Sequence, residues 1–219
     1  MMHKKQVDYR LTGEYLTPAV IRIGQYETPV WMQQRWQGGE FTTYIRNNGC
    51  GHCCTAMAAR LHGVQIDPHS EYIYCRKLWG DPSEKQGHWL TTMGIVKVLH
   101  SLGVPAQGFG VAQFGAQQAT VQIVSALEAG KQVVFTSNPD HYPDNPFSKG
   151  YHWVMAVSLE ENGTILVANS SDKATIEGVQ RVTCDMIEKA LFAEATAPED
   201  MTWGEPDRIY EGSGFVVVG

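Results

Sequence analysis

The sequence predicts an α+β fold, in which helices come first along the chain and a mostly antiparallel sheet follows. Good helix formers with helical apolar spacing fill much of residues 50–129, whereas β-branched segments dominate after residue 133. The tripeptide Glu161-Asn162-Gly163 separates two of these apolar segments, which is typical of a β-hairpin.

The composition bounds the class of protein. Of the 219 residues, 43% are hydrophobic and 18% are charged, as expected for a soluble globular chain. The net charge of −6 offers no basic surface to nucleic acid and disfavours contact with an anionic membrane. We therefore expect neither a nucleic-acid partner nor a membrane partner.

Three features bear on location. The chain has no apolar run of about eighteen residues, and its N-terminus does not resemble a secretory signal. Its five cysteines are an odd number, so at least one cannot pair within the chain. These features favour a reducing, cytoplasmic location, whereas a leader trimmed from the natural chain would indicate secretion.

The N-terminal part differs from the rest. We expect residues 1–45 to form an arm of extended segments and loops, and residues 46–219 to form a single domain. The arm is expected to pack onto that domain through its aromatic side chains. These are Trp31, Trp36, Phe41 and Tyr44.

The first clear helix begins near Cys50, where Asn47 and Asn48 offer an N-cap, and it ends at Gly63. Apolar spacing predicts further helices over residues 70–78, 90–102, 119–129 and 185–193. Strands are predicted over residues 133–135, 151–159, 164–168 and 215–218.

The stretch from Asn48 to Met57 has the features of a nucleophile site. A cysteine in the first turn of a helix lies at the positive end of the macrodipole, which favours the reactive thiolate. The free N–H groups of that turn can stabilise an oxyanion. Glycines on both sides of Cys50, including Gly51, allow a substrate carbonyl to approach closely.

A nucleophilic cysteine needs a base, and the base needs an orienting partner. His152 stands at the beginning of a predicted strand, directly after a loop with three prolines. If the hairpin strands pair through Asn162, residues whose numbers sum to roughly 321–325 lie opposite each other. His152 and Asn169 satisfy this condition, so Asn169 is expected to bind one ring nitrogen and direct the other toward Cys50.

The ordered set of motifs resembles a known family. Cys-Gly-x-x-x-x-Ala-Met from Cys50, Gly-Lys-Gln-Val-Val from Gly130, aromatic-His-Trp-Val around His152 and Val-x-Asn ending at Asn169 follow one another. In order and spacing this set is similar to the bacteriocin-processing peptidases of the papain-like cysteine peptidase superfamily. The resemblance covers roughly residues 31–170 and implies a papain-like fold, with the catalytic cysteine at a helix N-terminus packed on an antiparallel sheet.

The resemblance also implies a function and its residues. It implies a cysteine peptidase acting on a peptide or amide substrate through an acyl-enzyme, without a cofactor, using Cys50, His152 and Asn169. Gln33 and Gln34 are the candidates for the family's oxyanion glutamine. The implied substrate contacts are Gly51, Trp153 and His141.

The sequence departs from the family pattern at three places. His52 stands where the family has proline, Tyr151 where it has glycine, and Asn169-Ser170 where it has Asp-Pro. A non-catalytic peptide-binding or regulatory module and an acyltransferase on the same scaffold therefore remain alternatives. We also expect the loop over residues 138–150 to act as a lid or specificity loop.

The sequence also allows a metal site near Cys50 and other choices of base and orienting residue. Cys50, Cys53 and Cys54 have helical spacing beside His52, but structural zinc sites usually use two paired knuckles, so no metal site is predicted. His88 is an alternative base and Asp172 an alternative orienting residue.

Overall fold

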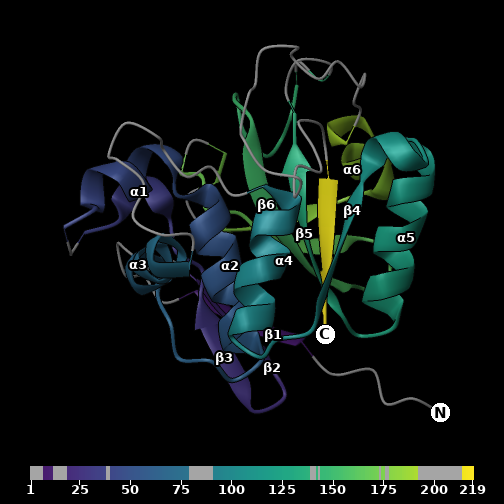
Figure 1. The fold of residues 1–219 in the computed structure, drawn as a ribbon. Helices are drawn as coiled ribbons and strands as arrows, with labels where there is room; N and C mark the ends of the chain where they lie inside the picture. Colours follow the sequence, from purple (N-terminus) through teal and green to yellow (C-terminus); the bar gives the residue numbers. More distant parts are fainter. Residues whose placement is uncertain are drawn as a thin grey trace.

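The computed structural model describes residues 7–11, 19–37, 40–78, 91–138, 142, 144–172, 174–175, 178–191 and 214–219. At its centre lies a six-stranded sheet in which each neighbouring pair is antiparallel (Figure 1). The strands lie in the order β4 (Ala106–Gly110), β9 (Gly214–Val218), β5 (Gln132–Ser137), β6 (His152–Leu159), β7 (Ile165–Ala168) and β8 (Val179–Val182).

Helices cover both faces of this sheet (Figure 1). Side chains of α2 (Cys50–Leu61) and α4 (Thr92–Ser101) join one hydrophobic cluster, and side chains of α5 (Ala116–Glu128) and α6 (Cys184–Ala190) join a second. Because successive strand residues point to opposite faces, β6 supplies both clusters. Its Trp153 and Met155 lie in the first, and its Val154 in the second.

A smaller antiparallel sheet precedes the helices along the chain. It consists of β1 (Val7–Leu11), β2 (Ala19–Ile23) and β3 (Tyr26–Pro29), followed by the short helix η1 (Gln33–Arg35). Trp31 is 6% exposed and belongs to the first cluster, so its side chain packs together with residues of α2 and α4. Trp36 packs against the same cluster.

The prediction for the first helix was partly wrong. A separate helix, α1 (Thr42–Asn48), ends where α2 begins, so the expected boundary at residue 45 falls inside α1. Asn47 and Asn48 are residues of α1, and they do not cap α2. The N-cap position is Gly49, which has no side chain to offer, and the two helices therefore meet end to end.

The helix α2 is central to the packing. Ten of its twelve residues are buried, so it has no solvent-facing stripe and must lie between two layers. One layer is the sheet, and the other is α3 (Pro68–Leu78), as Figure 1 shows. Its small side chains, including Ala56, Ala58 and Ala59, allow this close approach on all sides.

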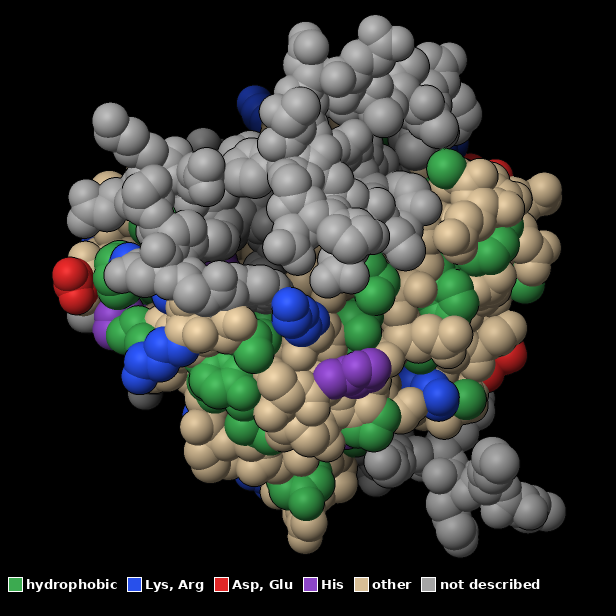
Figure 2. Space-filling model, in the orientation of Figure 1, with side chains coloured by type: hydrophobic (Ala, Val, Ile, Leu, Met, Phe, Trp, Pro, Cys, Tyr) green, Lys and Arg blue, Asp and Glu red, His purple; other side chains and the backbone are tan. Residues whose placement is uncertain are grey.

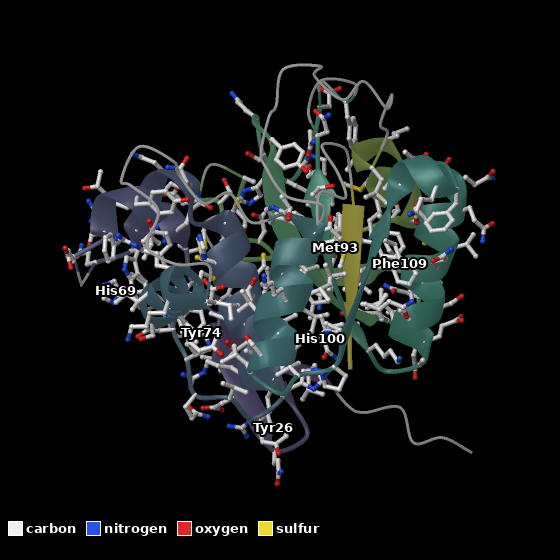
Figure 3. All side chains as sticks on the ribbon, in the orientation of Figure 1. Tyr26, His69, Tyr74, Met93, His100 and Phe109 are labelled. Atoms are coloured by element: carbon white, nitrogen blue, oxygen red, sulfur yellow. The ribbon has the colours of Figure 1, made fainter. Side chains whose placement is uncertain are left out.

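Most other predicted elements are present, with ends shifted by up to three residues. The hairpin register pairs Met155 with Ala168 and Ala156 with Val167, within the predicted range. Strands β4 and β8 were not predicted, because β4 contains two glycines and β8 has only two apolar residues, which flank Gln180 and Arg181. The position of β4 is supported by His100 of α4, whose Nε2 donates to the Ala106 carbonyl over 2.7 Å (Figure 3).

The surface shown in Figure 2 carries basic, acidic and hydrophobic side chains interspersed over its described part, without a continuous basic stripe. Within the described ranges, each helix is too short or too polar to cross a bilayer.

The helix junction generates a first prediction. A Cβ atom at Gly49 would lie 2.4 Å from the Ile45 carbonyl oxygen, so Gly49→Ala must displace α1 or the start of α2. We expect this substitution to lower the free energy of unfolding by about 1–3 kcal/mol in urea denaturation, as overpacking does. Gly150→Ala is the control, because nothing lies within 4 Å of the added atom. Equal stabilities of the two variants would contradict the tight junction.

Candidate active site

Cys50 is the first residue of α2 and is partly exposed, whereas Cys53, Cys54 and Cys75 are fully buried. The backbone groups of Trp153, Gly51 and Cys50 itself lower the pKa of its thiol. One turn later, the Cys54 thiol donates to the Trp153 carbonyl over 3.4 Å. This face of α2 therefore lies against the beginning of β6, where His152 immediately precedes Trp153.

The pKa of the Cys50 thiol is raised, whereas the sequence predicted that it would be lowered. Burial raises the pKa of its thiol above the ordinary value, and the nearby backbone groups lower the pKa by less. The helix N-terminus does act in the predicted direction, but desolvation is the larger effect. In the resting protein Cys50 is therefore a thiol, and a thiolate must be generated by transfer of its proton.

His152 is the first residue of β6 and is 3% exposed. Its Nε2 lies 2.9 Å from Oδ1 of Asn169, which follows the last residue of β7 and is fully buried. The contact predicted from the hairpin register is thus present. The two residues are seventeen positions apart in the sequence and meet only because the strands pair.

The Asn169 amide makes four hydrogen bonds. Its Oδ1 also accepts from the Ser171 N–H over 2.9 Å, while its Nδ2 donates to the Phe147 carbonyl over 2.9 Å and to Gln180 Oε1 over 2.7 Å. A backbone N–H can only donate and a backbone carbonyl can only accept, so the orientation of this amide has one solution. Oδ1 must therefore accept from His152, which assigns the ring proton to Nε2 and leaves Nδ1 as the acceptor of the neutral imidazole.

Burial also sets the protonation state of His152. Desolvation lowers the pKa of the imidazole from 6.5 to about 4, against a smaller raising effect of the Asn169 bond. The ring is consequently neutral near pH 7. The candidate site thus contains a neutral thiol and a neutral imidazole with a free acceptor nitrogen.

A further group of contacts holds Asn169 in place. Gln180 of β8 accepts from Asn169 and donates through Nε2 to the Pro146 carbonyl over 2.8 Å. The Phe147 side chain is fully buried and meets Phe135 edge to face, with ring centroids 5.5 Å apart. This end of the predicted lid loop is therefore anchored in the second hydrophobic cluster. Gln180 and Phe147 were not predicted from the sequence, where the only signal for Phe147 is an aromatic residue directly after a proline in a polar loop.

The oxyanion candidates are engaged in other contacts. Gln33 donates through Nε2 to the Arg46 carbonyl over 3.4 Å and accepts at Oε1 from the Ser170 hydroxyl over 3.3 Å. Gln34 Oε1 accepts from the Asp172 N–H over 3.1 Å. Both amides thereby hydrogen-bond to the segment that follows Asn169, at Ser170 and Asp172.

The remaining predicted residues are placed as follows. Gly51 follows Cys50 in α2, and its backbone is one of the groups that lower the pKa of the Cys50 thiol. The Trp153 side chain is 4% exposed and packs in the first cluster. His141 and the alternative base His88 lie outside the described residues.

Comparison with known proteins shows the fold. No family model and no curated protein matches the sequence. A C39-like peptidase from Bacillus anthracis has a similar structure, with a TM-score of 0.50 at 12% identity over 79% of this chain and 90% of that chain. The chain therefore has the fold of papain-like cysteine peptidases, as the sequence resemblance implied.

Two other solved structures are more distant. The peptidase domain of Streptococcus ComA, a bifunctional ABC transporter involved in quorum sensing, matches with a TM-score of 0.46 at 12% identity over 78% of this chain and 91% of that chain. The Pseudomonas avirulence protein AvrPphB matches with a TM-score of 0.37 at 9% identity over 80% and 94%, respectively.

The low pKa of His152 generates a second prediction. Between pH 6.5 and about 4, His152 binds a proton in the unfolded chain but not in the folded chain. The contribution of His152 to the free energy of unfolding is therefore fully present above pH 6.5, and it is lost as the pH falls toward 4. At pH 5 the loss attributable to His152 is about 2 kcal/mol. Urea denaturation at pH 7 and pH 5 should show a correspondingly smaller loss for His152→Gln. An equal loss in both proteins would assign the pH dependence to other groups.

Proposed function

We propose that the protein is a cysteine peptidase or related amide hydrolase, with Cys50 as nucleophile, His152 as base and Asn169 as the residue that orients the base. One observation carries this proposal. The Cys54 thiol donates to the Trp153 carbonyl, so the helix that begins at Cys50 packs against the start of β6, where Asn169 determines the tautomer of His152. The papain-like fold supports the same assignment.

The first chemical step follows from the resting charges. Nδ1 of neutral His152 accepts the thiol proton as the Cys50 sulfur attacks the substrate carbonyl carbon. The developing oxyanion requires hydrogen-bond donors. The backbone N–H groups of Cys50 and Gly51, in the first turn of α2, have no partner within the helix and are the candidates for this role.

The second step completes the reaction. The His152 imidazolium donates its proton to the leaving amine as the carbon–nitrogen bond breaks, which leaves a thioester on Cys50. Water then attacks the thioester with His152 again as base. The products are an amine and a carboxylic acid, and the thiol is restored.

The positions of Gln33 and Gln34 favour a supporting role over a direct one. The Gln33 amide already donates to the Arg46 carbonyl, and its backbone N–H donates to the Ser170 carbonyl over 2.9 Å. We infer that these residues keep the chain after Asn169 in place, while backbone groups stabilise the oxyanion.

Thiol labelling tests the nucleophile and its base. In a Cys184→Ser background, which removes the other partly exposed thiol, we expect iodoacetamide to label Cys50 faster than the three buried cysteines. Because His152 removes the proton, His152→Ala should slow the fast reaction at least about tenfold. Mass spectrometry of the alkylated peptides measures both effects. Equal slow labelling of all remaining thiols would contradict this assignment.

Hydrolysis of a fluorogenic peptide library tests the orienting residue. We expect Cys50→Ala to abolish activity and Asn169→Ala to lower kcat by about 10- to 100-fold, because the imidazole loses its orientation. Asn169→Asp should retain more activity, since a carboxylate still accepts from Nε2. Asn162→Ala, in the turn of the same hairpin, is the control. Full activity of Cys50→Ala would instead support the non-catalytic module.

A further inference from the structure

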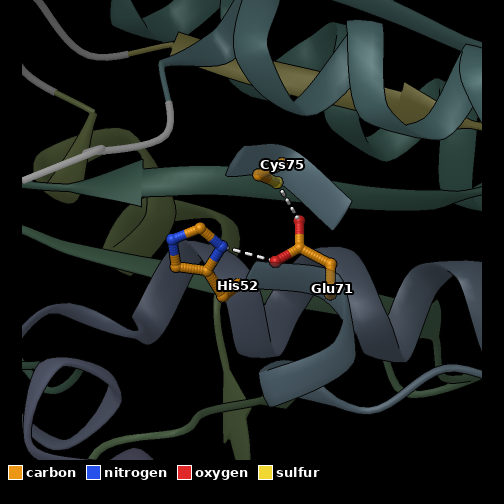
Figure 4. Close-up of side chains that lie close together, drawn as sticks. All are labelled: His52, Glu71 and Cys75. Atoms are coloured by element: carbon orange, nitrogen blue, oxygen red, sulfur yellow. Dashed lines mark hydrogen bonds and ion pairs between the residues drawn. The ribbon is translucent and has the colours of Figure 1, made fainter. Parts of the chain in front are cut away.

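A second cluster of reactive side chains lies outside the proposed catalytic set. His52 of α2 meets Glu71 and Cys75 of α3, and all three side chains are buried (Figure 4). Nδ1 of His52 is hydrogen-bonded to Oε2 of Glu71, and the Cys75 thiol donates to Oε1 of the same carboxylate over 3.0 Å. The three potential ligand atoms lie within 4.8 Å of one another.

The cluster encloses a carboxylate and an incompletely bonded imidazole. Glu71 is 0% exposed, and a buried carboxylate is stable only when paired or bound to a metal. The Nε2 atom of His52 is also buried, and it has no hydrogen-bond partner among the residues that the structure describes. A divalent cation held by the three side chains would neutralise the carboxylate.

The ligand chemistry indicates which cation. Imidazole nitrogen, carboxylate oxygen and thiolate sulfur are the three ligand types that zinc takes in proteins, whereas magnesium and calcium prefer oxygen alone. A neutral imidazole, a carboxylate and a thiolate together carry a charge of −2, which a divalent ion neutralises. The spacing also fits, because Glu71 and Cys75 are four residues apart on one helical face.

We propose that His52, Glu71 and Cys75 form a structural zinc site that joins α2 to α3. This revises the expectation of no metal, which considered His52 only with cysteines of its own helix. Glu71 and Cys75 lie 19 and 23 residues after His52, so the cluster exists only when the two helices pack. The site is independent of the proposed hydrolysis, but it holds the helix on which Cys50 stands.

Metal analysis of the full chain, with its thiols reduced, tests the site. After equilibration with zinc and gel filtration, we expect about one zinc per chain, and cobalt substitution should give a thiolate-to-cobalt charge-transfer band. Cys75→Ser should abolish that band, and Glu71→Gln should weaken zinc binding at least about tenfold. Zinc should also raise the Tm of the wild-type chain.

Two controls separate this site from other thiols. Cys50→Ala and Cys184→Ser should retain both the zinc and the charge-transfer band. Loss of zinc in Cys50→Ala would place the metal at the proposed catalytic thiol and overturn the inference. Failure of the wild-type chain to bind zinc in equilibrium dialysis would overturn it as well, and this result does not depend on any variant folding.

Discussion

The hydrogen-bond saturation of the Asn169 amide is the constraint on which the candidate site depends. Two partners donate to its oxygen and two accept from its nitrogen, so the side chain cannot rotate without leaving buried groups unpaired. Its partners come from the beginning of β6, the loop before β6, the segment after β7 and the strand β8. The sheet and its second hydrophobic cluster thereby determine which nitrogen of one imidazole can accept a proton.

Burial determines the charge state of that imidazole and of the Cys50 thiol. Desolvation raises the pKa of Cys50 and lowers that of His152, so both groups are uncharged at rest. The same close packing surrounds α2, whose small side chains fit between the sheet and α3. In the proposed mechanism, charge would enter the site only when a proton moves from the Cys50 sulfur to His152.

The packing of α2 also links the candidate active site to the proposed zinc site. Cys50 faces the start of β6, and His52, two residues later, faces Glu71 of α3. In a helix, residues two apart lie on different sides, so one short segment contacts both layers. His52 occupies the position where the family has proline, and its buried contact with α3 gives this departure a structural reason.

The sequence by itself determined the α+β order, the hairpin register that brings His152 to Asn169, and the placement of Cys50 at a helix start. These depend on local periodicity and turn residues, which are readable without long-range contacts. It did not reveal that α1 precedes α2, because a helix junction at Gly49 depends on a close approach to Ile45. The anchoring of Asn169 by Gln180 and Phe147, the net effect of burial on the Cys50 thiol, and the meeting of His52 with Glu71 were decided only by the tertiary structure. Each requires segments distant in sequence to exclude water from a shared interior, and no local pattern encodes that exclusion.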